Sequence, residues 1–453
     1  MRALMLAAMQ SGSGKTAVTC ALLAAARRRG LDVHPFKTGP DYIDPMFHTR
    51  AAGRPSRNLD LFLQGEAGVR RTLATAGATA GDGLALIEGA MGYYDGMAGG
   101  TDAGAWAVAD ALGIPAVLVL RPAGQGVTLA AQLYGMLRFR TPSHIAGVLF
   151  NGCKASLADY LAPIVTRETG LPVLGTLPPC DAAKFDSRHL GLQIPGEIDG
   201  LDARFAALAE ILEQNADLDK LLALAADLPV EQSGQTGTSK PTCRIAVARD
   251  EAFCFTYADN LDALQRAGAE LCFFSPLHGE ALPEDCDALY LCGGYPELHA
   301  GALAQNAPMR QAVRQAVTSD MPTVAECGGF LYLGQALEDD DGNSFPMAGA
   351  LPGEGYRTDR LRRFGYLTLT ADADSLLLHK GETLPAHEFH YWEARQPGGD
   401  LTARKPGRDK SWQCCFAGPT LYAGFPHLHF GGSLPLAERF VAAAAAHRQR
   451  KAE

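Results

Sequence analysis

Ala3-Leu-Met-Leu-Ala-Ala8 is an apolar run, and Met9-Gln-Ser-Gly-Ser-Gly14-Lys15-Thr16 follows it without a break. The run has the length and composition of a buried strand, and residues 18–28 beyond the loop read as a helix. A strand, a glycine-rich turn ending in Gly-Lys-Thr and a helix, in this order, are typical of a phosphate-binding loop. The full pattern has glycine where Met9 stands, so the match is incomplete at its first position. We predict that this segment opens an α/β domain with a nucleotide site.

The rest of the first half alternates strand-like runs with helical patterns, which indicates a parallel sheet with flanking helices. The expected strands are residues 3–8, 33–36, 84–87, 116–120, 145–150 and 173–177. Helical periodicity covers residues 201–228, and a polar, glycine-rich stretch follows. We therefore predict a nucleotide-binding domain at 1–230, a linker at 231–242 and a second domain at 243–453.

The second half opens a new alternating series that reaches a turn at Cys327. Strands are expected at 244–248, 270–274 and 288–292, with helices at 257–267 and 434–447. The next expected strand is apolar and leads through Cys327 into two glycines, in the stretch Pro322-Thr-Val-Ala-Glu-Cys327-Gly-Gly-Phe330. Glycines directly after a nucleophile let backbone N–H groups face the reacting carbonyl. The stretch predicts a second α/β domain with a cysteine nucleophile on a strand-to-helix turn.

Composition narrows the class of protein. The chain has 453 residues, of which 47% are apolar and 20% charged, and this is enough for two or three domains with full cores. A net charge of −10 argues against a nucleic-acid partner. Eleven scattered cysteines without a C-x-x-C pair favour a reduced, cytoplasmic location. No apolar window approaches a membrane span, so we expect no membrane partner.

The glycine-rich loop is expected to bind the phosphates of a nucleotide at a helix N-terminus. The backbone N–H groups expected there belong to Ser11, Gly12, Ser13, Gly14, Lys15 and Thr16. The Lys15 side chain would reach the β and γ phosphates, and Thr16 would ligate Mg²⁺. Lys37, at the end of the second strand, is placed to reach the same phosphates.

Acidic residues follow the ends of the neighbouring strands. Asp41 and Asp44 come after the second strand, and Glu88 and Asp95 come after the third. Because the carboxyl ends of parallel strands meet at one edge of a sheet, these residues suit a Mg²⁺-nucleotide site. The alternative is that all four are turn residues and helix caps.

The thiol of Cys327 needs a base, and the late stretch Phe425-Pro-His427-Leu-His429-Phe430 offers two imidazoles on one face of a strand. His427 would accept the thiol proton, and His429 would orient it. The glycines at a second strand end, Gly293 and Gly294, would form an oxyanion hole with Gly328. The alternative is a buried, inert cysteine beside a packed strand.

Taken together, these stretches resemble known families. Residues 243–447 resemble the class I (Triad) glutamine amidotransferases of the cobyric-acid-synthase-like branch, and the first domain is similar to the dethiobiotin-synthetase-like P-loop fold. The pair in this order resembles the cobyrinic acid a,c-diamide synthase family. The stretches that carry the resemblance are Ser11-Gly-Ser-Gly-Lys-Thr16, Phe36-Lys-Thr-Gly-Pro-Asp-Tyr-Ile-Asp-Pro45, Arg54-Pro-Ser-Arg-Asn-Leu-Asp60, Glu88-Gly-Ala-Met-Gly92, Arg188-His-Leu-Gly-Leu192, His387-Glu-Phe-His-Tyr391 and His427-Leu-His-Phe430.

The resemblance implies an enzyme that uses ATP, Mg²⁺ and L-glutamine to amidate two acetate groups of cobyrinic acid, and it is compatible with a homodimer. It implies Thr16, Asp41 and Glu88 as metal ligands. It implies as substrate residues Tyr42, Asp44, Asp95, Arg188 and His189. Triad enzymes commonly have glutamate two residues after the histidine, and His429 stands there in this chain.

A polycarboxylate macrocycle needs cations on an acidic protein, and an aromatic ring could pack on its faces. Tyr42 and Tyr391 are the candidate aromatic rings. The candidate cations are Arg54, Arg57, Arg188, Arg357, Arg360, Arg362 and Arg363. Two alternatives stay open: the same chemistry on hydrogenobyrinic acid or nickel sirohydrochlorin, and a P-loop ATPase switch with a degenerate amidotransferase domain.

Overall fold

The computed structural model describes residues 1–77, 83–184, 187–188, 191–229 and 241–452. The chain divides into two compact units, Met1–Gly234 and Gln235–Glu453. Most of the expected linker at 231–242 lies outside the described residues, so its boundaries stay a prediction.

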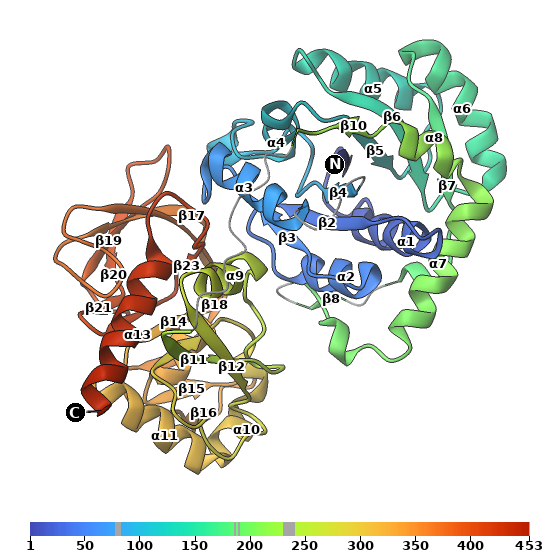
Figure 1. Ribbon diagram of the computed structural model, residues 1–453. Coiled ribbons are helices and arrows are strands. Elements are labelled where there is room, and N and C mark those ends of the chain that lie inside the picture. The colour runs from blue at the N-terminus through green and yellow to red at the C-terminus, as the bar shows by residue number, and fades with distance from the viewer. Residues whose placement is uncertain (78–82, 185–186, 189–190, 230–240, 453) are drawn as a thin grey trace. The chain divides into compact units, whose positions relative to one another are not determined.

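The first unit is built on an eight-stranded sheet, in which seven strands run parallel in the order β3-β2-β4-β1-β5-β6-β7 (Figure 1). Its strands are β1 (Arg2–Ala7), β2 (Val33–Thr38), β3 (Arg57–Leu59), β4 (Leu84–Glu88), β5 (Ala116–Leu120), β6 (Ile145–Asn151), β7 (Val173–Leu177) and the antiparallel β10 (Ala226–Asp227), which pairs with β1. All six strands expected from the sequence are confirmed. The short β3 and β10 were not predicted, because neither has enough apolar residues to give a periodic pattern.

Helices flank this sheet (Figure 1), and α1 packs against α2 and α7. The helices are α1 (Lys15–Arg28), α2 (Ile43–Ala52), α3 (Gly65–Gly77), α4 (Ala105–Leu112), α5 (Val127–Phe139), α6 (Ala155–Thr169), α7 (Leu201–Asn215) and α8 (Leu218–Ala223). Short 3₁₀ turns are η1 (Met97–Gly99), η2 (Asp181–Ala183) and η3 (Pro195–Glu197), and β8 (Ser187–Arg188) pairs with β9 (Gly191–Leu192).

The prediction of continuous helical structure over residues 201–228 is wrong at its end. Helix α7 stops at Asn215, and Ala216 forms a bridge with Gly175. Asp217 then caps α8 by accepting a hydrogen bond from the Lys220 N–H (3.0 Å), and the chain finishes in β10. A cap residue inside a periodic pattern starts a new helix, which periodicity alone does not reveal.

The second unit contains a six-stranded sheet in the order β12-β11-β13-β14-β22-β21, parallel except for β21. Its strands are β11 (Cys243–Ala248), β12 (Ala269–Phe274), β13 (Ala288–Leu291), β14 (Thr323–Glu326), β21 (Phe416–Gly418) and β22 (Leu421–Gly424). Its helices are α9 (Ala258–Arg266), η4 (Pro296–His299), α10 (Ala300–Gln305), α11 (Ala307–Thr318), α12 (Gly328–Leu333) and α13 (Leu436–Ala452). The expected strands and the helices at 257–267 and 434–447 are confirmed, with ends shifted by a few residues.

A second, mostly antiparallel sheet in this unit carries the late histidines. Its strands are β15 (Ala336–Glu338), β16 (Ser344–Pro346), β17 (Glu354–Ala371), β18 (Thr383–Ala394), β19 (Leu401–Arg404), β20 (Ser411–Cys414) and β23 (His427–Leu428). Strand β18 pairs with β23 and sets His387 opposite His427. The register thereby brings the predicted base beside the His387-Glu388 stretch.

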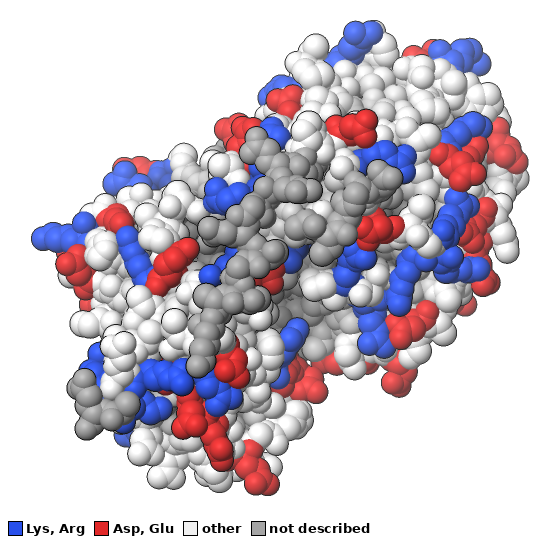
Figure 2. Space-filling view, in the orientation of Figure 1, with Lys and Arg blue, Asp and Glu red and all other residues white. Residues whose placement is uncertain are grey.

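Charged side chains of both signs are interspersed on the face shown in Figure 2. All eleven cysteines are free thiols. Among the helices that the structure describes, none combines the length and the apolar character that crossing a membrane requires.

Candidate functional sites

The phosphate loop between β1 and α1 is held from the end of β6. Asn151 donates from Nδ2 to the Ser13 carbonyl (2.8 Å), and the Ser13 hydroxyl donates to the Gln10 carbonyl (2.9 Å). Gly14 has φ of 78°, and a methyl group on it would clash with the Asn151 amide. Glycine is therefore required at this position by both conformation and space. The first-turn N–H groups of α1 have no intrahelical acceptor and suit an anion.

Two lysines converge on the space in front of this loop. Lys15 donates from Nζ to the Met91 carbonyl (2.7 Å), and burial, followed by the charge of Lys37, lowers its pKa. Lys37 is buried at the end of β2 and donates to Asp44 Oδ2 (2.5 Å) and Glu88 Oε1 (2.8 Å). Burial would lower the pKa of Lys37, but these carboxylates outweigh it and raise the pKa. Lys37 therefore remains a cation at neutral pH.

Three oxygen-bearing side chains meet beside Lys37. The Thr16 hydroxyl lies 3.1 Å from Asp44 Oδ1 and 3.2 Å from Glu88 Oε1. His48 fixes the other oxygen of Glu88, with 2.7 Å between Nε2 and Oε2. Burial would raise the pKa of Glu88, but Lys37 and His48 hold it well below its usual value, so Glu88 is ionised. Asp44, expected as a substrate residue, thus lies with the proposed metal ligands.

These oxygens fit Mg²⁺ in one respect that the structure shows. Burial, and then the charge of Asp41, raise the pKa of Asp44, so this carboxylate lacks enough positive charge around it. In the part of the chain that the structure describes, no three His, Cys, Asp or Glu side chains form a metal cage by themselves. Asp44 and Glu88 supply the one or two carboxylates that commonly hold Mg²⁺ together with phosphate oxygens and water.

Two of the expected acids have local structural roles, as the alternative interpretation held. Asp41 accepts the N–H groups of Ile43 (2.8 Å) and Asp44 (3.3 Å) at the start of α2, although it also lies 3.8 Å from Lys37 Nζ. Asp95 Oδ2 accepts the Gly92 N–H (3.0 Å) within a turn. Their assignments to metal and substrate stay predictions.

The expected substrate residues are not gathered into one site by the contacts that the structure gives. Tyr42 lies next to α2, and Arg54 pairs with Asp32 (2.6 Å). His189 and the side chain of Arg188 lie outside the described residues. In the second unit, two of the four clustered arginines also have acidic partners: Arg357 pairs with Asp340 (3.7 Å) and Arg363 with Glu393 (3.5 Å).

Cys327 lies on the predicted turn between β14 and α12, with φ of 48° and ψ of −103°. A non-glycine residue in this region is strained, and such strain is typical of a nucleophile held at the tip of a turn. Gly329 packs so closely against β13 that a methyl group on it would clash with the Leu291 carbonyl. The glycine pair thus lets α12 start against the neighbouring strand.

The glycines expected around the oxyanion lie together beside the thiol. A methyl group on Gly293 would lie 3.4 Å from the Cys327 Cβ and only 2.6 Å from His427 Cε1. A methyl group on Gly328 would lie 3.1 Å from the Gly294 nitrogen. The backbone of the two strand ends and the His427 ring therefore surround Cys327, as a thiol site with an oxyanion hole requires.

Glu326, which was not predicted, faces His427. Its Oε2 lies 3.7 Å from His427 Nδ1. Its Oε1 accepts the Leu428 N–H (3.2 Å), and the Tyr290 hydroxyl donates to Oε2 (3.4 Å). The contacts that the structure gives His429 are with the Gly431 N–H (3.0 Å to Nδ1) and the Tyr257 ring (4.9 Å between centroids). The geometry therefore favours Glu326 over His429 as the residue that orients His427.

Electrostatics keep the thiol protonated in this state. Burial raises the pKa of Cys327 well above its usual value, and the charge of Glu297 raises it further. A protonated thiol is a weak nucleophile, so proton transfer to a neighbouring base is needed for attack. Burial also lowers the pKa of His429 to about 3, so this imidazole is neutral.

Each residue that the sequence analysis missed had a signal. Glu326 is a charged residue inside an apolar strand, His48 lies four residues after Asp44 on α2, and Asn151 is the polar end of β6. The i,i+4 spacing puts Asp44 and His48 on one helix face toward Glu88.

Comparison with known proteins covers nearly the whole chain. Residues 4–192 match the family model described as the CobQ/CobB/MinD/ParA nucleotide binding domain, and residues 244–434 match the CobB/CobQ-like glutamine amidotransferase domain. Three curated relatives are each named cobyrinate a,c-diamide synthase. The Clostridium tetani protein is 35% identical over 96% of this chain and 98% of its own length. The Gloeobacter violaceus protein is 40% identical (97% and 96%), and the Salmonella typhimurium protein is 38% identical (98% and 98%).

Proposed function

The chain belongs to the cobyrinate a,c-diamide synthase family, and on this premise we propose that it amidates the a and c acetate carboxylates of cobyrinic acid with ATP and glutamine. The observation that carries the proposal is the presence of two sites in one chain: a strained Cys327 beside His427, and a phosphate loop beside two lysines. The first supplies a nitrogen nucleophile, and the second activates a carboxylate.

Cys327 is proposed to release ammonia from glutamine. His427 takes the thiol proton, and the sulfur forms a bond to the glutamine side-chain carbonyl carbon. The N–H groups of Gly294 and Gly328 would bind the oxyanion of the tetrahedral intermediate. The C–N bond then breaks, and His427 returns the proton to the departing ammonia. Water hydrolyses the resulting thioester to glutamate and restores the thiol.

The P-loop unit is proposed to turn a carboxylate into an acyl phosphate. A carboxylate oxygen of the macrocycle attacks the γ-phosphorus of ATP and ADP leaves, while Lys15 and Lys37 balance the negative charge on the phosphates. Ammonia attacks the acyl carbon, phosphate departs, and a proton lost from nitrogen leaves the amide. Two rounds give the diamide.

Thr16, Asp44 and Glu88 are the residues that would hold Mg²⁺, with Asp41 as a further predicted ligand. When bound, Mg²⁺ would neutralise phosphate charge in phosphoryl transfer. Lys37 and His48 keep Glu88 ionised and oriented for this task.

We place the protein in the cytoplasm, which agrees with its eleven free thiols. Light scattering would test whether the chain forms the homodimer with which the resemblance is compatible.

Mass spectrometry of the product tests the activity and the choice of substrate. The purified protein receives ATP, Mg²⁺ and glutamine with cobyrinic acid, hydrogenobyrinic acid or nickel sirohydrochlorin in separate reactions. Two carboxyl-to-amide conversions on cobyrinic acid, with two ATP consumed, are expected. Preferential conversion of another acid would replace the substrate, and ATP hydrolysis without any amide product would support the switch alternative.

A further inference from the structure

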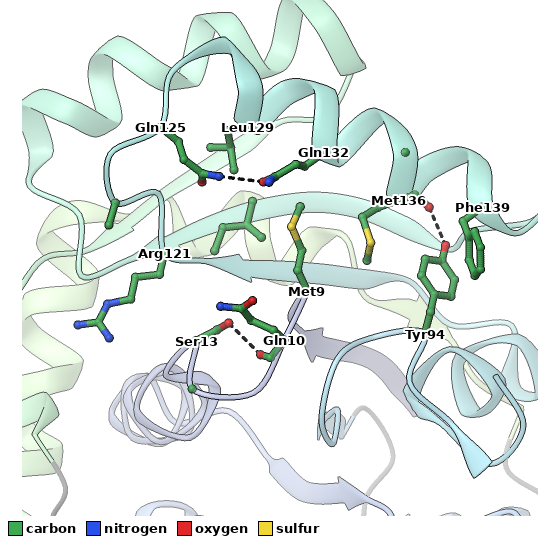
Figure 3. Close-up of a pocket in the computed structure, with 14 residues that line it drawn as sticks. Met9, Gln10, Ser13, Tyr94, Arg121, Gln125, Leu129, Gln132, Met136 and Phe139 are labelled. Carbon is green, nitrogen blue, oxygen red and sulfur yellow. Dashed lines mark hydrogen bonds between the residues drawn. The ribbon is translucent and has the colours of Figure 1, made fainter. Parts of the chain in front are cut away.

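A cavity of about 890 Å³ opens beside the phosphate loop within the first unit (Figure 3). Residues of the loop itself, the segment after β4, the end of β5 with the segment that follows it, and one face of α5 all line it. Small-molecule pockets span roughly 300–1,000 Å³, so this cavity is near the upper end of the range. The ligand of this cavity is therefore expected to be near the upper size limit for small-molecule ligands.

Part of the cavity wall is apolar, where Tyr94 packs against the end of α5, and specific contacts hold its shape; Gln125 and Gln132 form a polar stretch of the wall and hydrogen-bond each other (3.0 Å). Met9 and Met136 face the cavity together with Tyr94 and Phe139 (Figure 3). The Tyr94 hydroxyl donates to the Met136 carbonyl (2.7 Å), and its ring meets Phe139 edge-on at 5.0 Å. Thioether and aromatic side chains pack well on the face of a conjugated ring. Phe139 is 55% exposed, so this apolar surface is open to a ligand.

Arg121 offers hydrogen-bond donors suited to carboxylates at the edge of the cavity, where its side chain extends away from Met9 and Met136 (Figure 3) and lies beside Gly152. Arg121 is exposed, and the structure gives it no ion pair with any residue it describes. In the same unit, Arg54 is tied to Asp32 and Arg50 to Asp202. Arg121 therefore keeps its charge available for a ligand carboxylate, which a guanidinium binds with two parallel hydrogen bonds.

The position of the cavity connects it to the proposed phosphorylation. Gly12 and Ser13 line the cavity, and Lys15 follows in the same loop. A ring seated between α5 and the loop would bring a carboxylate on its edge toward the phosphates that Lys15 holds. An apolar face, an arginine that forms no ion pair with the residues described and contact with the phosphate loop are together what a flat, carboxylate-rimmed macrocycle requires.

We propose that this cavity binds the tetrapyrrole macrocycle, with its face against Tyr94, Met136 and Phe139 and a peripheral carboxylate on Arg121. This assignment rests on the proposed function and adds the location of the substrate. It differs from the arginines that the sequence suggested, several of which are already paired with acids.

Gly135 provides a sharp test, because it lines the cavity within α5 and a methyl group there would meet no atom within 4 Å. Gly135→Phe should fill the cavity without disturbing the helix, since any other residue favours a helix more than glycine does, except proline. The matched control is Ala131→Phe, at an exposed position of α5 that does not line the cavity.

Equilibrium ultrafiltration with coloured cobyrinic acid measures binding without catalysis. We expect Gly135→Phe to weaken corrinoid binding about tenfold or more, with ATP binding and glutamine hydrolysis at wild-type levels, and Ala131→Phe to match the wild type. Arg121→Gln should also weaken corrinoid binding, and Arg121→Lys should restore part of it.

Each other outcome overturns the inference. Wild-type corrinoid binding by Gly135→Phe would place the ring elsewhere, and loss of ATP binding alone would assign the cavity to the nucleotide. A change of oligomeric state in Gly135→Phe with unchanged corrinoid binding would assign the face to a second copy of the chain. If the wild-type protein amidates none of the three tetrapyrrole acids, the proposed function fails, independently of these variants.

Discussion

At the scale of single residues, the thiol site departs from the pattern that its sequence suggested. The expected acidic residue two positions after His427 is absent, and His429 stands there instead. In the structure, a different carboxylate lies beside His427: that of Glu326, the last residue of β14, which immediately precedes the nucleophile. Residues next to each other in a strand point to opposite faces, but the strained backbone at Cys327 breaks this alternation. Cys327 and Glu326 can therefore both approach one imidazole.

Replacement of Glu326 by Gln tests whether this carboxylate orients His427 and stabilises its cationic form. We expect glutamine hydrolysis to fall at least roughly 10- to 100-fold, the range seen when a carboxylate that supports a metal-bound histidine is removed. The pH profile of kcat/KM for glutamine should also shift, whereas amidation with added ammonia should keep its wild-type rate. A merely structural role would lower glutamine hydrolysis without shifting this pH profile.

Glu438→Gln is the matched control, because Glu438 is exposed on α13 of the same unit. It should leave both reactions unchanged. Wild-type glutamine hydrolysis in Glu326→Gln would return the orienting role to His429.

At the scale of elements, the sequence predicted regular strands well and irregular connections poorly. The six long strands of the first sheet are continuous apolar runs, and their burial on both faces is the reason for that pattern. Helix α8 was not predicted as a separate helix, because the helical periodicity of the sequence continues past the cap at Asp217. The candidate nucleotide site was largely predictable, since strand ends meet at one edge of a sheet. Local patterns mark His48 and Asn151 as unusual, but their partners, Glu88 and the Ser13 carbonyl, depend on packing between elements and cannot be read from those patterns.

Two buried histidines of the second unit, His387 on β18 and His429 just after β23, predict sensitivity to acid. Burial, followed by the charge of His427, lowers the pKa of His387 to about 3, and burial alone lowers that of His429 to about 3. An unfolded histidine titrates near 6.5, so between about pH 6.5 and 3 the unfolded chain binds more protons. The free energy of unfolding should therefore fall with pH below about 6.5, by about 2 kcal/mol per histidine at pH 5.

Urea unfolding followed by tryptophan fluorescence measures this slope. Trp392 and Trp412 lie in the second unit and Trp106 in the first, so Trp106→Phe makes the signal report the second unit alone. His429→Asn should reduce the dependence of unfolding free energy on pH between 6.5 and 5, and the exposed His379→Gln should not. An equal slope in wild type and His429→Asn would contradict a neutral, buried His429.

At the scale of the whole molecule, the two units carry separable halves of one reaction. The first unit contains the phosphate loop with Lys15, and the second contains Cys327. If the second unit only supplies ammonia, substitutions of the two residues must affect amidation in different ways. Cys327→Ser should abolish amidation with glutamine and leave amidation with added ammonia near the wild-type rate. Lys15→Ala should abolish amidation with either nitrogen source, because no acyl phosphate forms.

The controls are Cys180→Ser and Lys220→Ala, which change the same residue types at positions outside both sites. A mixture of the two inactive variants adds a further test. In this mixture, ammonia released by the Lys15→Ala protein must pass through solvent to reach the Cys327→Ser protein. We therefore expect only slow amidation, and an added ammonia-consuming enzyme should suppress it. The wild-type chain should resist that suppression if ammonia passes directly between its own sites.

Glutamine-dependent amidation by the Cys327→Ser variant alone would contradict a role of the thiol in the mechanism. Wild-type amidation rates in the Lys15→Ala variant would contradict the acyl phosphate.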